Sequence, residues 1–118
     1  MGNLLSSMRA KFETLRTLAF GSIANLTYTA VGASFANPIR ILKISNTTDI
    51  DVFISFDGVT NIDVVVANGF VLYDLSTNKS NQVGVLEIPS GSKIYVIRGA
   101  VAATSGNIYV TTIYASQT

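Results

Sequence analysis

The chain has 118 residues, 48% of them apolar and 13% charged, with a formal net charge of +1. This length fits one domain, and so small a net charge gives no long-range attraction for nucleic acid or an anionic membrane. The sequence contains no Cys, His or Trp. Disulfides, the usual transition-metal ligands and the usual proton shuttle at neutral pH are therefore excluded.

The charged fraction is about half of that usual in soluble domains. Such a composition indicates that part of the surface is buried in an oligomer or a larger assembly. A monomer with a neutral, polar surface is the alternative. No apolar stretch is long enough to cross a bilayer, so we expect no membrane partner, and the scattered basic residues do not favour a nucleic-acid partner.

Residues 1–12 differ from the rest of the chain. Leu4, Leu5, Met8 and Phe12 recur at spacings of three and four, which is typical of one side of a short helix. A helix this short is marginal alone. We interpret 1–12 as an N-terminal arm or helix that orders on a neighbouring subunit, with a frayed terminus as the alternative. The same four residues are the candidate assembly interface.

From residue 13 onward, short β-branched and aromatic runs alternate with turn residues, as strands and reverse turns require. The expected strands are 13–20, 24–31, 38–45, 51–56, 60–67, 70–75, 83–88, 93–98 and 107–115. Strands at this spacing predict an all-β fold, an antiparallel β-sandwich that is jelly-roll-like. Residues 13–118 are thus expected to form a single β-sandwich domain behind the arm 1–12.

Some local patterns make sharper predictions. The run 39–44 changes parity at Leu42, which predicts a bulge there. The Val-rich run 62–67 is expected at the centre of a sheet or against another chain. The pair Asn68-Gly69 predicts a tight hairpin, and Asp57-Gly58 a hairpin turn. Both faces of 107–114 are largely apolar, which indicates a covered position or a partner.

The sequence carries no reaction signature. Asp49-x-Asp51 lacks the further ligands and the turn glycine of a calcium loop. Serines are plentiful, but activation of a serine needs a neighbouring base and no His is available. We therefore expect no enzyme activity, no catalytic or metal-binding residue and no cofactor.

Four segments carry a resemblance to a known class. They are Ile54-Ser-Phe-Asp-Gly58, Gly69…Leu72-Tyr73-Asp74…Thr77-Asn78, Ile88-Pro-Ser-Gly-Ser-Lys-Ile-Tyr-Val96 and Ser105-Gly-Asn-Ile-Tyr-Val110. Together they resemble small β-sandwich virion proteins of tailed bacteriophages, over roughly residues 38–115. Proteins of that class sit at the head–tail junction as connector, adaptor or ring components, or decorate the capsid or tail. The resemblance implies a structural role and homo-oligomerisation, and it carries no catalytic or cofactor residue.

The expected function is therefore a non-enzymatic virion structural protein, an oligomeric head–tail connector, ring or neck component. Its partners would be other virion proteins (portal, capsid or tail components), and it would be made in the host cytoplasm and located in the virion. The alternative is a capsid or tail decoration or a carbohydrate-binding β-sandwich module. The carbohydrate-binding alternative requires an exposed, concave cluster of all or some of five tyrosines: Tyr28, Tyr73, Tyr95, Tyr109 and Tyr114.

Overall fold

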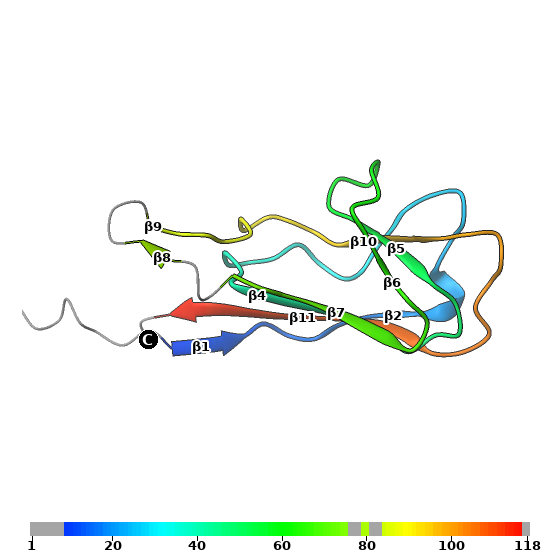
Figure 1. The fold of residues 1–118 in the computed structure, drawn as a ribbon, viewed down its shortest axis with the longest axis horizontal. Coiled ribbons are helices and arrows are strands. Elements are labelled where there is room, and N and C mark those ends of the chain that lie inside the picture. The colour runs from blue at the N-terminus through cyan, green and yellow to red at the C-terminus, as the bar shows by residue number, and fades with distance from the viewer. Residues whose placement is uncertain (1–8, 76–78, 81–83, 117–118) are drawn as a thin grey trace, which may run out of the picture.

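The computed structural model describes residues 9–75, 79–80 and 84–116. Two antiparallel sheets lie face to face in it, one below the other in Figure 1. The larger sheet has the order β1-β11-β4-β7, with β2 also paired to β11, and the smaller has the order β3-β10-β5-β6. The strands of the larger sheet are β1 (Arg9–Phe12), β2 (Arg16–Ala19), β4 (Ile41–Asn46), β7 (Gly69–Asp74) and β11 (Asn107–Ser116).

The smaller sheet contains β3 (Thr29–Ala30), β5 (Val52–Ser55), β6 (Asp63–Val65) and β10 (Tyr95–Arg98). Apart from the two sheets, β8 (Lys79–Ser80) pairs with β9 (Gly84–Val85), and a 3-10 turn, η2, spans Phe20–Ser22. We set β8 and β9 aside and take β1 and β2 together as the first strand, which pairs with the last strand, β11. Successive pairs nest inside this one: β3 with β10, β4 with β7 and β5 with β6. This nesting is the jelly-roll order, so the predicted all-β sandwich and its jelly-roll character are confirmed.

Strand β11 lies at the centre of the larger sheet. Its ten residues pair with β1 and β2 on one side and with β4 on the other. Ile108, Val110 and Thr112 point into the sandwich and are fully buried, whereas the residues between them point outward. The period of two along an extended chain therefore assigns each β11 side chain to the core or to the outside.

The core lies between the two inward faces. Branched aliphatic residues dominate it, and these side chains interdigitate without leaving polar atoms to satisfy. Its fully buried large members are Phe35, Ile39, Leu42, Ile44, Ile54, Ile94, Ile108, Val31, Val52, Val65, Val96 and Val110.

Buried Asn46 links the two sheets at the end of β4. Its Nδ2 donates to the carbonyl oxygens of Ile50 (2.8 Å) and of Val65 in β6 (2.9 Å). Its Oδ1 accepts bonds from the backbone N–H of Thr48 (2.9 Å) and from that residue's hydroxyl (2.6 Å). One amide side chain thus satisfies polar groups of both layers that would otherwise be buried without partners.

Several local expectations need correction. Residues 9–12 form β1 rather than a helical turn, because they pair with β11 along their whole length. The remainder of the expected arm, residues 1–8, lies outside the described residues. The prediction of a bulge at Leu42 is wrong, because Leu42 pairs regularly with both neighbouring strands. The irregularity lies at Arg40, whose N–H bonds the carbonyl of Ile113 although Ile41 is the register partner of Ile113.

The segment around residue 68 also differs from expectation. Asn68 adopts φ 57° and the N–H of Gly69 bonds the carbonyl of Val66, so a tight turn is present. The strands that it joins, β6 and β7, belong to different sheets, and no hairpin forms. Strand β6 is an edge strand, so 62–67 does not lie at the centre of a sheet, and its contact with another chain stays a prediction. Asp57-Gly58 does lie in the connection between the paired strands β5 and β6, as predicted.

The inter-sheet role of Asn46 is testable by truncation. We expect Asn46→Ala to lower the free energy of unfolding by about 3 kcal/mol, because it leaves several buried donors and acceptors unpaired. Urea unfolding followed by circular dichroism measures this change. The matched control is Asn25→Ala at an exposed position, for which a change within about 0.5 kcal/mol is expected. Equal effects of the two substitutions would contradict the role assigned to Asn46.

Candidate interaction surface

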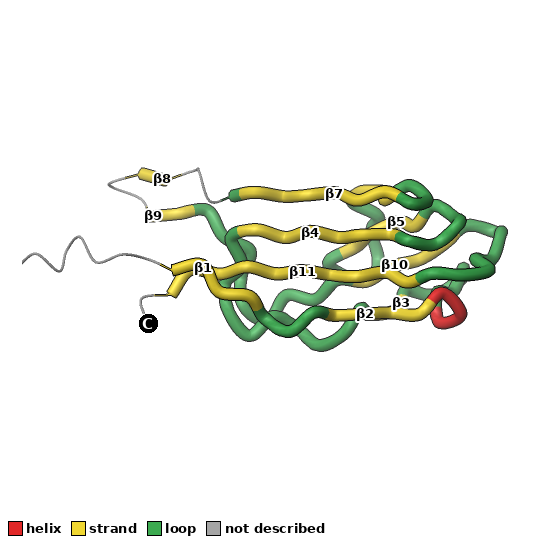
Figure 2. Tube along the Cα trace, turned by 90° about the horizontal axis from the view of Figure 1, so that it is seen from below, coloured by secondary structure: helices red, strands yellow, loops and turns green. Residues whose placement is uncertain are grey.

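The outward side of the larger sheet carries exposed Phe and Leu side chains at both of its edges. We call it the A face, and Figure 2 shows its strands lying in front of the rest of the molecule. Phe12 is 66% exposed and Leu15 52% at one edge, and Phe70 is 62% and Leu72 54% exposed at the other. Partly buried residues of β4 and β11 and one lysine lie between these edges: Ile41, Lys43, Tyr109 and Ile113.

Lys43 is the basic residue of the A face. Its ammonium lies 5.4 Å from the centre of the Phe70 ring, which places the charge over an aromatic face. The side chain can cover apolar surface with its methylene stem while its charged end reaches water. Ser45 and Thr111 share the outward side with Lys43, so the exposed Phe and Leu side chains of the A face lie mainly along its two edges.

A bulge divides the edge strand formed by β1 and β2. Phe12 pairs with Ile113 and Arg16 with Val110, so three residues, 13–15, oppose two residues of β11. The extra residue reverses the alternation of inward and outward side chains. Arg16 consequently points into the sandwich, whereas in a regular strand it would share the outward side with Phe12.

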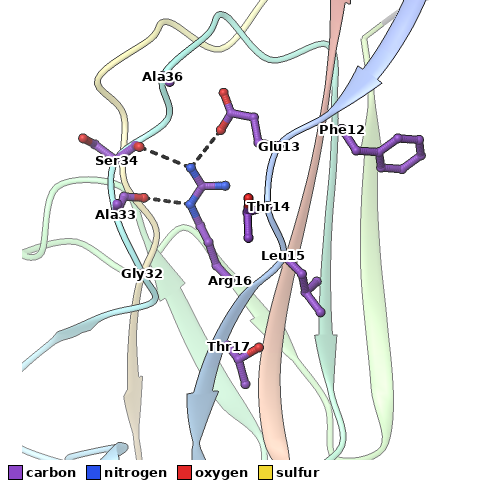
Figure 3. Close-up of a pocket in the computed structure, with 10 residues that line it drawn as sticks. All are labelled: Phe12, Glu13, Thr14, Leu15, Arg16, Thr17, Gly32, Ala33, Ser34 and Ala36. Carbon is purple, nitrogen blue, oxygen red and sulfur yellow. Dashed lines mark hydrogen bonds and ion pairs between the residues drawn. The ribbon is translucent and has the colours of Figure 1, made fainter.

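Figure 3 shows the result of this reversal. Glu13 and Arg16 lie on the side of the strand that faces residues 32–36, and Phe12 and Leu15 lie on the other side. Arg16 Nη2 contacts Glu13 Oε1 at 2.8 Å, and Arg16 Nε donates to the carbonyl of Ala33 at 2.8 Å. The bulge therefore separates a polar inner contact from two apolar side chains on the A face.

The Glu13–Arg16 pair is extensively bonded. Glu13 Oε2 accepts hydrogen bonds from the backbone N–H (2.9 Å) and the side-chain amide (2.7 Å) of Asn37. Arg16 Nη1 donates to the Thr112 hydroxyl (3.1 Å), and its guanidinium carbon lies 5.0 Å from the centre of the Phe35 ring. Burial acts to raise the pKa of Glu13, but the bonds from Arg16 and Asn37 outweigh it and hold that pKa below its ordinary value.

A groove of about 640 Å³ opens beside this pair. Both carboxylate oxygens of Glu13 and three nitrogens of Arg16 already have partners. These groups fix the edge strand to the 32–37 segment, so their arrangement is that of a structural clamp.

The aspartates that the sequence offered as candidate ligands have separate local partners. Asp49 accepts from the N–H and hydroxyl of Thr104, at 2.9 and 2.5 Å, and Asp51 Oδ1 accepts from the N–H of Ala67 at 2.9 Å. Among the described residues, no group of three or more acidic, His or Cys side chains is placed to hold a metal ion. The Asp49-x-Asp51 motif is thus used in loop hydrogen bonds.

Asp57 shapes the β5–β6 connection. The backbone N–H groups of Thr60 and Val59 bond its Oδ1, as does the hydroxyl of Ser55 (each 2.8 Å). These bonds favour the charged form and lower the pKa of Asp57 to about 2. Between the two sheets, the hydroxyl of Tyr73 in β7 donates to Asp63 in β6, and burial together with this bond raises the pKa of Tyr73.

The predicted interface residues have different outcomes. Phe12 lies at the edge of the A face with most of its ring exposed, while Leu4, Leu5 and Met8 lie outside the described residues. Their role in assembly stays a prediction. The sequence did not lead us to select Leu15, Phe70 or Leu72 as candidate interface residues. The signal for the last two was the six-residue run 69–74, in which both alternating sets of side chains are largely apolar.

The five tyrosines considered for a binding platform lie on different parts of the molecule. Tyr73 and Tyr114 pack against the core, and Tyr109 belongs to the A face. The hydroxyl of Tyr28 donates to Asn61, and Tyr95 lies against Gly58, so these two rings adjoin the β5–β6 connection. The structure distributes the set over several surfaces.

Comparisons with protein-family models, with curated proteins and with solved structures each gave no match. In the described part of the chain, no helix is long and apolar enough to span a membrane.

The charge of Glu13 predicts a pH-dependent contribution to stability. A carboxyl whose pKa is lowered by folding stabilises the fold above its unfolded pKa, and this contribution is lost as the pH falls through the folded value. Glu13→Gln should therefore lower the free energy of unfolding at pH 7. The gap from the unsubstituted chain should shrink as the pH falls below the ordinary pKa of a Glu carboxyl and through the lowered pKa of Glu13. Denaturant unfolding across this range measures it.

The matched control is Glu87→Gln, which neutralises an exposed carboxyl. Its effect at pH 7 should be close to zero, because exposed charges contribute little. A gap for Glu13→Gln that stays constant between pH 7 and pH 3 would contradict the role given to the Glu13 charge.

Proposed function

We propose that this chain is a non-enzymatic structural subunit of a tailed-bacteriophage virion, an oligomeric connector, ring or neck component at the head–tail junction. The observation that carries the proposal is the A face, whose exposed Phe and Leu side chains suit contact with protein better than contact with water. The sequence resemblance over residues 38–115 supplies the virion context. The fold is compatible with this role, since jelly rolls occur in viral capsid proteins.

Fold alone does not decide between classes, because jelly rolls also occur in lectins. The surface favours assembly. Permanent interfaces are rich in apolar side chains, and the A face exposes Phe12, Leu15, Phe70 and Leu72. Of the five tyrosines considered for a glycan-binding platform, Tyr73 and Tyr114 pack against the core, and only Tyr28 and Tyr95 adjoin the same connection.

The function of such a subunit is geometric. The sandwich supplies a rigid body, and the clamp between Glu13 and Arg16 fixes the edge strand that carries Phe12 and Leu15. In this proposal, Phe12 anchors the near edge of a subunit contact. Leu4, Leu5 and Met8, which precede β1, tie the subunit to a neighbour or to the portal.

Phage particles provide the direct test of the virion assignment. Tailed particles produced by the host that carries this gene should contain the chain in a fixed, multi-copy ratio to the portal protein, measured by quantitative mass spectrometry. Antibody labelling should place it at the head–tail junction. Its absence from purified particles would contradict the proposed function.

The role of the N-terminal residues is tested by removing 1–8 and leaving β1 in place. We expect the shortened chain to keep its β-rich circular dichroism spectrum and its unfolding midpoint, because residues 9–12 still pair with β11. Its incorporation into particles should fall at least tenfold in a complementation assay. The control carries Leu4, Leu5 and Met8 each replaced by Ser at full length and should show the same loss. Unchanged incorporation of both would remove these residues from the interface.

A further inference from the structure

The free sheet edges of this sandwich are not equivalent. Strand β3 has two residues and β6 has three. In β6 the N–H of Val64 is already bonded by Asp63 Oδ1 at 2.8 Å. The edge made by β1 and β2 is interrupted by the bulge at 13–15. Short strands, bulges and inserted side chains are the devices by which proteins prevent edge pairing. Strand β7 has none of them.

The hydrogen-bonding direction of β7 follows from the register. Leu75 donates its N–H to the carbonyl of Arg40, and Thr47 donates to Asn107 in β11. The backbone groups of successive residues in an antiparallel strand point to opposite neighbours. The odd-numbered residues of β4 therefore bond β11, and its even-numbered residues bond the odd-numbered residues of β7. The N–H and C=O groups of Phe70 and Leu72 therefore point away from β4. Among the described strands, β7 pairs with β4 only.

The same two residues carry exposed apolar side chains. Phe70 and Leu72 are more than half exposed on the A face. On the adjoining edge of the smaller sheet, Val64 and Val66 are also exposed, at 37% and 55%. One side of the sandwich thus combines unpaired backbone groups with apolar side chains, which is the pattern of a strand that recruits another strand.

We propose that β7 pairs with β7 of a second copy of this chain, antiparallel and related by a two-fold axis. In the pairing, Phe70 of each copy lies opposite Leu72 of the other, and Val71 lies opposite Val71. Backbone bonds form at Phe70 and Leu72, and the larger sheets of the two copies become one continuous sheet.

The register is selected by the side chains. With Phe70 opposite Leu72, two apolar pairs form by symmetry, and such cross-strand pairs stabilise sheets. A shift that sets Leu72 opposite Leu72 places Phe70 opposite Asp74, and the opposite shift places Leu72 opposite Asn68. The proposed register avoids both mismatches and keeps the two copies of Asp74 at opposite ends of the contact.

A second copy of this chain is the partner because the two-fold pairing uses the same β7 edge on both subunits. A two-fold contact is self-complementary and needs only the unprotected β7 edge. A head-to-tail arrangement would require β7 to pair with the β1–β2 edge of the next subunit, where the bulge breaks the ladder. The proposal rests on the homo-oligomeric part of the proposed function and concerns a two-fold contact between pairs of subunits, which is separate from the head-to-tail contacts that close a ring. A chain that dimerises through β7 but is absent from phage particles would overturn the virion assignment and leave this pairing intact.

Disulfide trapping tests the pairing directly, because the chain has no native Cys. Residues opposite each other at a non-hydrogen-bonded antiparallel pair have Cα atoms about 4.5 Å apart, which is within disulfide range. Val71→Cys should therefore form a cross-linked dimer of about 25 kDa, twice the 12.5 kDa chain, under mild oxidation. Thr17→Cys on the opposite edge and Leu72→Cys out of register should remain monomeric on non-reducing gels. Failure of Val71→Cys to cross-link, or preferential cross-linking at Leu72 or Thr17, would overturn the proposal.

Sedimentation equilibrium provides a second, independent measurement. The full chain should show a monomer–dimer equilibrium or a stable dimer. Leu72→Lys should weaken dimerisation by about a hundredfold or more, because the symmetric contact loses two buried Leu side chains. Thr17→Lys, an equally outward position at the other edge, should leave the dimer constant unchanged. A chain that is monomeric at every concentration, or equal effects of the two variants, would overturn the proposal.

Discussion

The alternation of side chains along β11 is the constraint on which the rest of the structure depends. This strand pairs with β1, β2 and β4, so its register fixes the inward and outward sets of the whole larger sheet. Ile108 and Val110 supply the centre of the core. The same register places Tyr109 and Ile113 on the outside. An apolar outer face is thus built by the strand that builds the core.

The edges of this sheet show how an exposed apolar surface is managed. At β1 and β2, a bulge turns Arg16 inward, where Glu13, the 33–34 carbonyls and Thr112 bind it. That clamp interrupts the ladder and fixes the edge. At β7 the chain has a regular six-residue strand and one charge at its end. The β1–β2 edge is thus protected from pairing with another strand, whereas the β7 edge is available for such pairing.

The sequence allowed the fold class to be predicted because branched and aromatic runs between turn residues specify strands and reversals locally. It could not identify sheet partners. The turn at Asn68-Gly69 was recognised, but only tertiary packing determines that β6 and β7 enter different sheets. Phe12 was selected as an interface residue within a helical pattern, but it lies in β1, because spacings of three and four fit a bulged strand equally well. Leu15 and Arg16 could not be assigned to their faces, because one extra residue at 13–15 reverses them.

Hydrogen–deuterium exchange at several protein concentrations tests the central claim, that the outward edge and face of the larger sheet contact another subunit. The amides of Phe70 and Leu72 point away from their own sheet, so their exchange in a lone subunit should be fast. The account predicts that the peptide covering 69–74 becomes protected as concentration rises, while the peptide covering 16–19 keeps its exchange rate. Exchange across 69–74 that is fast at every concentration would contradict it.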